Sequence, residues 1–327
     1  MSATVYQSCT LAPETPKSES GRPQVMAACL RKSAVPEEVP RLVPKELVHL
    51  KDQSGVLVTG WTRPSPEVFL VGAEWPGEPE GPGGARPAAG TAAGLVRQCG
   101  LAVSHAAFGV PLEYQSLLKK LNCTLTGPAP EWRDGRTPVT VELNCSQMIR
   151  RGGRVIGAEI MEFTVRHEGR VVCRADSRSQ WISPQVYRRL RGDHLTAPWG
   201  GWDVPEPVAP ELVGCSSAEE VALSATGRPD RWLLRNDPAN TEMFDHPVDH
   251  VPGLALLTAA HQAARAACGP LWTAPTAVST SFGRYVEFDA PCLLDVRTSG
   301  NGVVEVAGSQ YGLPAFRIVL SGRLPTG

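Results

Sequence analysis

The segment from Phe244 to Gln262, FDHPVDHVPGLALLTAAHQ, places two Asp-His steps directly before an apolar run. Pro252 and Gly253 separate the two parts, and proline is well suited to the first turn of a helix. The run that follows has no acidic residue, so a helix formed there is apolar around most of its circumference and must be covered on nearly all sides. The segment therefore predicts a buried helix with a polar loop at its amino end.

A similar order of elements occurs earlier in the chain. The segment TAAGLVRQCGLAVSHAAFG (91–109) predicts another apolar helix, in which Gln98 aligns with Gln262 at an offset of 164 residues. Each predicted helix is followed by runs rich in β-forming residues and divided by turns. These runs are 139–149, 154–169 and 170–182 in the first half, and 277–289, 292–311 and 315–324 in the second. The pattern indicates an internal duplication of a sheet wrapped around a helix.

The predicted organisation has four segments. Residues 1–44 are rich in Pro, Ser, Lys and Glu without apolar periodicity, which predicts a flexible N-terminal arm. A first repeat at 45–188 and a second at 229–327 are joined by a linker at 189–228. Within the first repeat, the composition of 76–90 is that of a flexible loop.

Composition limits the class of protein. The 327 residues are 42% hydrophobic and 20% charged, with a net charge of −1. This is a soluble globular profile, without the bulk charge that attracts nucleic acid or a membrane surface. The first residues lack the apolar core of a signal peptide, and no apolar run could span a bilayer, so we expect a cytoplasmic protein. Nine cysteines without a CxxC pair argue against a disulfide framework or a zinc site.

Particular motifs narrow the fold. The strings NDP (236–238), FDHPVDHVPG and LALLTAAHQAA look very like the second repeat of the A-factor synthase family, the γ-butyrolactone biosynthesis proteins of actinomycetes. VTGW, AEWP and LVRQCGLAVSHAAFGVPLEYQ resemble its first repeat. The resemblance implies an α+β double hotdog, in which two antiparallel sheets each wrap a long apolar helix and pack as a pseudo-dimer within one chain.

The resemblance also implies an acyltransferase. It would move a β-ketoacyl group from an acyl-carrier-protein or CoA thioester to a hydroxyl acceptor such as dihydroxyacetone phosphate, without a metal or other cofactor. Family members have Glu where this chain has Gly94 and Thr258, and Arg where it has His261. The alternative is therefore a diverged protein that binds an acyl chain or carrier protein as a sensor, a partner subunit or in a cyclisation or dehydration role. A dehydratase or thioesterase is a third possibility.

Three histidines are the candidate catalytic residues. Transfer to a hydroxyl needs a base near that hydroxyl and donors for the oxyanion. Neutral imidazoles of His246, His250 and His261 could accept the proton. We expect one of the first two to face the acyl pocket, with Asp245 or Asp249 orienting its ring. The alternative is a hydrogen-bonded loop that only closes the pocket.

Further residues are assigned to substrate binding. Gly253 would let a thioester oxygen approach the unpaired N–H groups at the helix start, unless it merely turns the chain. Thr258 lies one turn before His261 and is expected to orient that ring or to bind substrate, the alternative being a core histidine with one hydrogen bond. Pro247 and Pro252 disfavour a helix presenting both loop imidazoles on one face, so no metal site is expected.

Several basic and amide side chains remain. Arg97, within an apolar helix, would either bind a substrate phosphate or carboxylate or pair with an acidic residue of the other repeat. Gln98 and Gln262 are expected to bond backbone at equivalent places in the two repeats. Two arginine clusters would either dock an acidic carrier protein or stay solvated: Arg150, Arg151 and Arg154, and Arg188, Arg189 and Arg191.

Overall fold

The computed structural model describes residues 43–77, 88–130, 135–196, 198–269, 272, 274–299 and 301–322. They all belong to one compact unit, Pro40–Gly327. The predicted arm lies outside the described residues apart from Val43 and Pro44, and most of the predicted loop at 76–90 does too. Within the described ranges, no helix is both long and apolar enough to cross a membrane.

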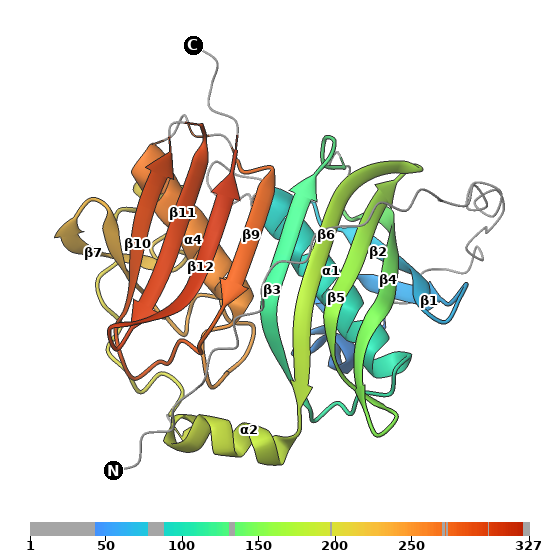
Figure 1. The fold of residues 1–327 in the computed structure, drawn as a ribbon. Coiled ribbons are helices and arrows are strands. Elements are labelled where there is room, and N and C mark those ends of the chain that lie inside the picture. The colour runs from blue at the N-terminus through green and yellow to red at the C-terminus, as the bar shows by residue number, and fades with distance from the viewer. Residues whose placement is uncertain are drawn as a thin grey trace, which may run out of the picture. The chain divides into compact units, whose positions relative to one another are not determined.

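Twelve described strands form one antiparallel sheet, ordered β1-β2-β4-β5-β6-β3-β9-β12-β11-β10-β8-β7 (Figure 1). The first repeat contributes β1 (Val58–Thr62), β2 (Val68–Trp75), β3 (Gln115–Leu125), β4 (Thr137–Arg151), β5 (Arg154–His167) and β6 (Arg170–Ile182). The second contributes β7 (Leu223–Arg228), β8 (Arg231–Leu234), β9 (Ala277–Phe282), β10 (Cys292–Ser299), β11 (Val303–Gln310) and β12 (Leu313–Ser321).

The two halves of the sheet have the same topology in mirrored order, which confirms the predicted double hotdog. They meet edge to edge at β3 and β9, where the Thr280 hydroxyl accepts from the Leu121 N–H and donates to its carbonyl, both at 2.9 Å. The two predicted sheets are thus one continuous sheet. Strand β7 falls within the predicted linker, 189–228, and takes the place that β1 has in the first repeat.

Two long helices lie behind the sheet in Figure 1, each against its own half. Helix α1 (Ala88–Ala106) and helix α4 (Gly253–Cys268) correspond to the two predicted helices. The first of them ends at Ala106 rather than at Gly109, which has a φ of 65° that glycine adopts readily. Shorter helices are α2 (Pro184–Arg191), α3 (Pro210–Val213), η1 (Lys45–Val48), η2 (Gln53–Gly55) and η3 (Gly192–Thr196).

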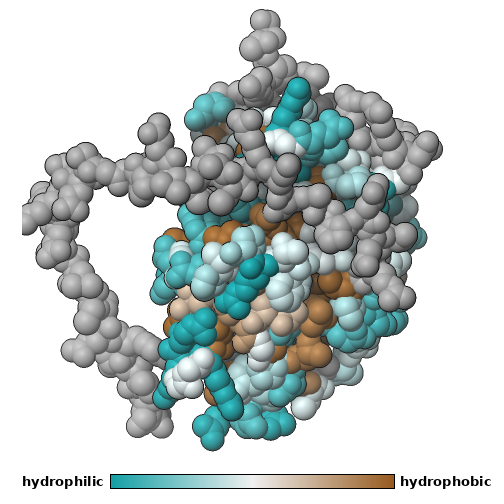
Figure 2. Space-filling model, turned by 90° about the vertical axis from the view of Figure 1, so that its right-hand side faces the viewer, coloured by the Kyte–Doolittle hydropathy of each residue, from teal (hydrophilic) through white to brown (hydrophobic). Residues whose placement is uncertain are grey.

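Apolar side chains of both helices fill the core, as their sequences require. Leu95, Val96 and Cys99 of α1 have no exposed surface, and neither do Ala259 and Ala260 of α4. Burial raises the pKa of the Cys99 thiol to about 12, so it is a core side chain without nucleophilic character. Viewed from the side on which β1 lies, apolar and polar surface are interspersed (Figure 2).

The matching glutamines have matching contacts, which confirms that prediction. Gln98 accepts from the Leu57 N–H at 2.8 Å and donates to the Gly55 carbonyl at 2.9 Å. Gln262 accepts from Ala222 at 2.7 Å and donates to Glu220 at 2.8 Å. Each amide therefore ties its helix to the segment that leads into the edge strand of its own repeat.

We expect Gln262→Met to lower the free energy of unfolding by about 2–3 kcal/mol, because the buried Ala222 N–H and its neighbouring carbonyl lose their partner. Gln98→Met should cost about 1 kcal/mol less, since the Gln98 amide is partly exposed and water can replace it. Denaturant titration of the two variants measures the difference. Equal losses would show that burial does not distinguish the two amides.

Candidate active site

The polar loop leads directly into α4. The Val251 N–H donates to the Val286 carbonyl at 2.9 Å, which fixes the chain just before Pro252, the N-cap residue. In the first turn, the N–H groups of Gly253, Leu254 and Ala255 have no acceptor among the described residues. Such groups, together with the helix dipole, favour a negatively charged atom.

Gly253 also has a packing role. A Cβ atom at this position would lie 3.0 Å from the Phe282 ring. The absence of a side chain therefore lets the start of α4 pack closely on the end of β9, beside the free N–H groups. The approach of a substrate oxygen to Gly253 stays a prediction.

Asp249 and His250 form a dyad beside this helix start. The His250 Nδ1 lies 2.7 Å from Asp249 Oδ1, and the two side chains are 29% and 25% exposed. A carboxylate accepts, so Nδ1 carries the proton and a neutral ring presents a lone pair at Nε2. Burial alone would raise the pKa of Asp249, but hydrogen bonds from His250 and Tyr187 and the charge of Arg191 hold it well below its usual range.

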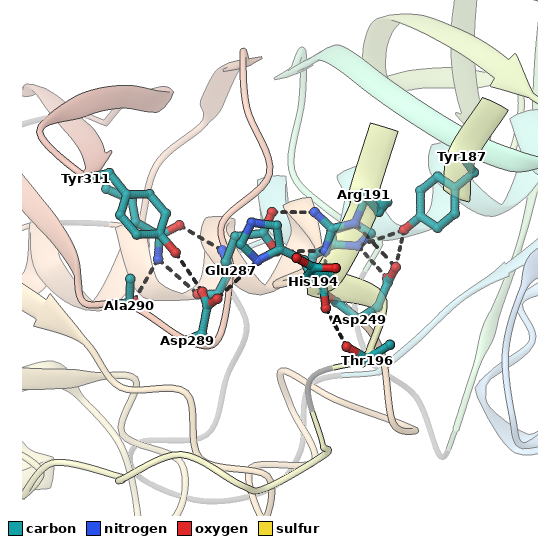
Figure 3. Close-up of polar contacts among 12 residues, drawn as sticks. Tyr187, Arg191, His194, Thr196, Asp249, Glu287, Asp289, Ala290 and Tyr311 are labelled. Carbon is teal, nitrogen blue, oxygen red and sulfur yellow. Dashed lines mark hydrogen bonds and ion pairs between the residues drawn. The ribbon is translucent and has the colours of Figure 1, made fainter. Parts of the chain in front are cut away.

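Two residues of helix α2 fix this dyad from the other side. Tyr187 donates to Asp249 Oδ2 at 2.5 Å, and Arg191 donates from Nη2 to the Asp249 carbonyl at 2.5 Å. Figure 3 shows the Arg191 guanidinium between Asp249 and Glu287, and its Nη2 lies 2.7 Å from Glu287 Oε2. The guanidinium also lies 4.3 Å from the centroid of the Tyr285 ring. We call Tyr187, Arg191, Asp249 and Glu287 the α2 clamp.

The clamp corrects the prediction for one arginine cluster. Arg191 is only 2% exposed and therefore cannot dock a partner or stay solvated. Arg188 and Arg189, on the same helix, are exposed as predicted for a solvated cluster. The clamp could not be predicted because nothing in RRLR marks which of its three arginines is buried, although the i, i+4 spacing of Tyr187 and Arg191 does put them on one face.

The polar contacts extend beyond the clamp along the β9–β10 connection (Figure 3). His194 Nδ1 lies 3.1 Å from Asp289 Oδ2, and Tyr311 donates to the other oxygen of Asp289 at 2.7 Å. The Glu287 N–H donates to Gln310 Oε1 at 2.8 Å. The backbone of the residue that receives Arg191 is thus fixed by a hydrogen bond of its own.

The other Asp-His step contacts the first repeat. His246 Nδ1 lies 2.6 Å from Asp245 Oδ1, and the second oxygen of Asp245 accepts from the Lys51 N–H at 3.0 Å. His246 is 37% exposed, so its ring is more open to solvent than that of His250. Each aspartate of the loop thus bonds the histidine that follows it, and whether either ring faces an acyl pocket stays a prediction.

Two further histidines, for which the sequence pattern predicts no role, lie in the first repeat. His49 Nε2 and His105 Nε2 are 2.8 Å apart, and His105 Nδ1 donates to the Val110 carbonyl at 2.7 Å. When both rings are neutral, His49 must therefore donate from Nε2 and keep its lone pair at Nδ1. Burial, followed by the charges of Arg97, His105 and His246, lowers the pKa of His49 to about 4.

Arg97 lies next to this histidine pair. Its Nη1 donates to the Ser116 hydroxyl at 3.0 Å, and no carboxylate of the described residues pairs with it. Burial lowers its pKa to about 10. Arg97 and Trp181 line a cavity of about 10 Å³, enough for roughly one water molecule. The expected alternative, an ion pair with the other repeat, is absent from the described residues.

Thr258 and His261 both lie on helix α4, but no hydrogen bond joins their side chains. The Thr258 hydroxyl donates to the Leu254 carbonyl of its own helix at 3.3 Å, so the expected orienting bond to His261 does not form. His261 is buried, and its Nε2 has no partner among the described residues. A Cβ atom at Gly90 would lie 3.2 Å from the imidazole, which therefore packs between the two long helices. A catalytic role for His261 stays a prediction.

Stability should fall in acid because of His261. Burial lowers the pKa of His261 from 6.5 to about 4, so between these values the unfolded chain binds more protons than the folded protein. Stability is therefore lost as pH falls through that window. We expect His261→Leu to remove up to about 3 kcal/mol of this loss. Unfolding free energies near pH 7 and about pH 4.5 test it, and the same acid loss in both proteins would contradict it.

A family model for the A-factor biosynthesis hotdog domain matches residues 94–183 and again residues 202–309. This chain belongs to that family. The 2-oxo-3-(phosphooxy)propyl 3-oxoalkanoate synthase of Streptomyces virginiae is 36% identical over 86% of this chain and 97% of its own length. The protein of the same name from Streptomyces coelicolor is 36% identical over 69% and 73%. An acyl-ACP thioesterase structure from Bacteroides thetaiotaomicron covers 77% of this chain and 97% of its own, with 14% identity and a TM-score of 0.47.

This A-factor biosynthesis hotdog protein has open space where the resemblance implies a helix glutamate. A Cβ atom at Gly94 would meet nothing within 4 Å, and Thr258 replaces the second carboxylate. Neither of these two helix positions therefore carries a carboxylate that could accept a proton. Among the described residues, no group of three or more His, Cys, Asp or Glu side chains is placed to hold a metal ion.

Proposed function

We propose that the protein joins a 3-oxoacyl group, delivered as a thioester on CoA or an acyl carrier protein, to a hydroxyl of dihydroxyacetone phosphate. The ester formed would be a 2-oxo-3-(phosphooxy)propyl 3-oxoalkanoate, the compound in the name of its relatives. The observation that carries the proposal is the Asp249–His250 dyad beside the free N–H groups of α4. In the proposal, a base and oxyanion donors come from one short segment of the chain, residues 249–254.

In this reaction, the acceptor hydroxyl attacks the thioester carbonyl while its proton passes to His250 Nε2. Asp249 keeps the other ring nitrogen protonated and stabilises the imidazolium that forms. The carbonyl oxygen becomes an oxyanion, which the N–H groups of Gly253 and Leu254 stabilise. As the intermediate collapses, the C–S bond breaks and the departing thiolate takes the proton from His250.

The remaining candidate residues receive supporting roles in the proposal. The Asp245–His246 pair lies in the same loop and is the alternative base. Arg97, a cation without a carboxylate partner, would bind the acceptor phosphate. Thr258 would contact the substrate. His261 would act as a base only if the packing between α1 and α4 opened.

A binding protein without turnover is the second candidate function. Gly94 and Thr258 favour it, because both positions lack the carboxylate that the resemblance implies. Such a protein would hold an acyl chain or an acyl carrier protein and release no thiol.

One assay separates the candidates. The protein is incubated with a 3-oxoacyl thioester, with and without dihydroxyacetone phosphate, and released thiol and product mass are followed. We expect thiol and ester to appear together and to require the acceptor. Thiol release without ester would indicate a thioesterase. Saturable acyl binding without thiol release would indicate the binding protein and overturn the proposal.

A further inference from the structure

A groove of about 420 Å³ opens between the turn after α1 and the tip of the β4–β5 hairpin. This volume is typical of small-molecule sites. Aromatic and apolar side chains form most of the wall, and two arginines of the hairpin face them. The lining includes Phe108, Pro111, Tyr114, Arg151, Arg154 and Val155.

The two arginines are arranged to hold an anion. Arg151 and Arg154 are a direct cross-strand pair, both are exposed, and neither has a carboxylate partner among the described residues. Like charges directly opposite each other destabilise a hairpin, and an anion bound between them removes that repulsion. Guanidinium groups match phosphate oxygens in geometry as well as in charge. The adjoining aromatic wall would suit an apolar or amide-containing continuation of the same ligand.

Contacts connect this groove with the candidate active site. Val110, next to the lining residue Pro111, accepts from His105, and His105 bonds to His49. Two residues after His49, the Lys51 N–H donates to Asp245 of the loop that carries the Asp-His pairs, at 3.0 Å. Hydrogen bonds through residues 49–51 therefore link the edge of the groove to the loop that carries His250.

We propose that this groove binds the phosphate and the adjoining arm of 4′-phosphopantetheine, the group that presents the thioester. The inference rests on the proposed function, because it assigns the donor side of that reaction. CoA and acyl carrier proteins share this arm, so the groove serves either source. The arginines bind its phosphate and the aromatic wall contacts its chain, while the thioester end extends towards the loop.

Binding can be measured without turnover. Calorimetry compares 4′-phosphopantetheine with pantetheine, which lacks the phosphate, on the full-length protein. We expect wild type to bind the phosphorylated form about ten- to a hundredfold more tightly, and Arg151→Gln/Arg154→Gln to abolish that preference. Arg188→Gln/Arg189→Gln on α2 removes two equally exposed arginines and should keep it. An unchanged preference in the hairpin variant would overturn the proposal.

Steady-state kinetics test the same groove and show whether the 4′-phosphopantetheine arm is presented by CoA or by an acyl carrier protein. For the phosphate-bearing donor that wild type uses, whether acyl-CoA or acyl carrier protein, we expect the hairpin variant to have a KM about tenfold higher or more. Its KM for an acyl-N-acetylcysteamine thioester, which has no phosphate, should not change. An equal rise for all donors would contradict phosphate recognition. If no donor is turned over, the proposed function fails, and the calorimetry still decides whether the groove binds the arm.

Discussion

Replacing His250 with alanine is expected to reduce ester formation by about a thousandfold, because the variant loses both the base and the acid that serves the leaving thiolate. Asp249→Asn should also be severely impaired, since an amide can stabilise the wrong tautomer of the ring and cannot stabilise an imidazolium. Product mass and thiol release under saturating donor and acceptor measure both effects. The folded fraction is checked by the unfolding transition of each variant.

His246→Ala is the matched control, because it removes an imidazole with the same aspartate arrangement from the same loop. We expect it to keep at least about a tenth of the activity, since its dyad is more exposed and contacts the Lys51 backbone. Added imidazole should partly restore His250→Ala and leave wild type unchanged. A large loss in His246→Ala beside an active His250→Ala would assign the base to the other dyad.

Replacing Arg191 with methionine is expected to lower the free energy of unfolding by about 3–5 kcal/mol, the usual effect of removing one partner from a buried ion pair. The arginine is 2% and Glu287 7% exposed, so the abandoned carboxylate would stay out of water. Denaturant titration measures the loss. Arg191→Lys should be intermediate, because an ammonium keeps the charge but cannot bridge Asp249 and Glu287 as a planar fork.

Arg188→Met is the appropriate control, since it shortens an exposed arginine on the same helix and should change stability by less than about 0.5 kcal/mol. Combining Arg191→Met with Glu287→Gln should recover part of the lost stability, because the second substitution removes the stranded charge. If Arg191→Met and Arg188→Met behaved alike, the clamp would not contribute to stability.

The long helices and most strands could be predicted because their signals are local. An apolar helix without acidic residues and runs of alternating side chains require only short-range periodicity. Strand β3 could not be predicted, because its local pattern is interrupted. Lys119 and Lys120 lie in its centre, and its register shifts between Leu118 and Lys120. These features break the alternation, although this strand joins the two repeats.

The sequence by itself determined the duplication, the two buried helices, the family, and the loop in which both Asp-His pairs form. Each of these depends on neighbouring residues or on a repeat that can be aligned. Only the tertiary structure decided which arginine is buried and how the dyad is held. Arg191 and Glu287 are 96 residues apart, and the burial of an arginine depends on packing that brings a distant carboxylate to it. No local pattern in the α2 segment carries that information.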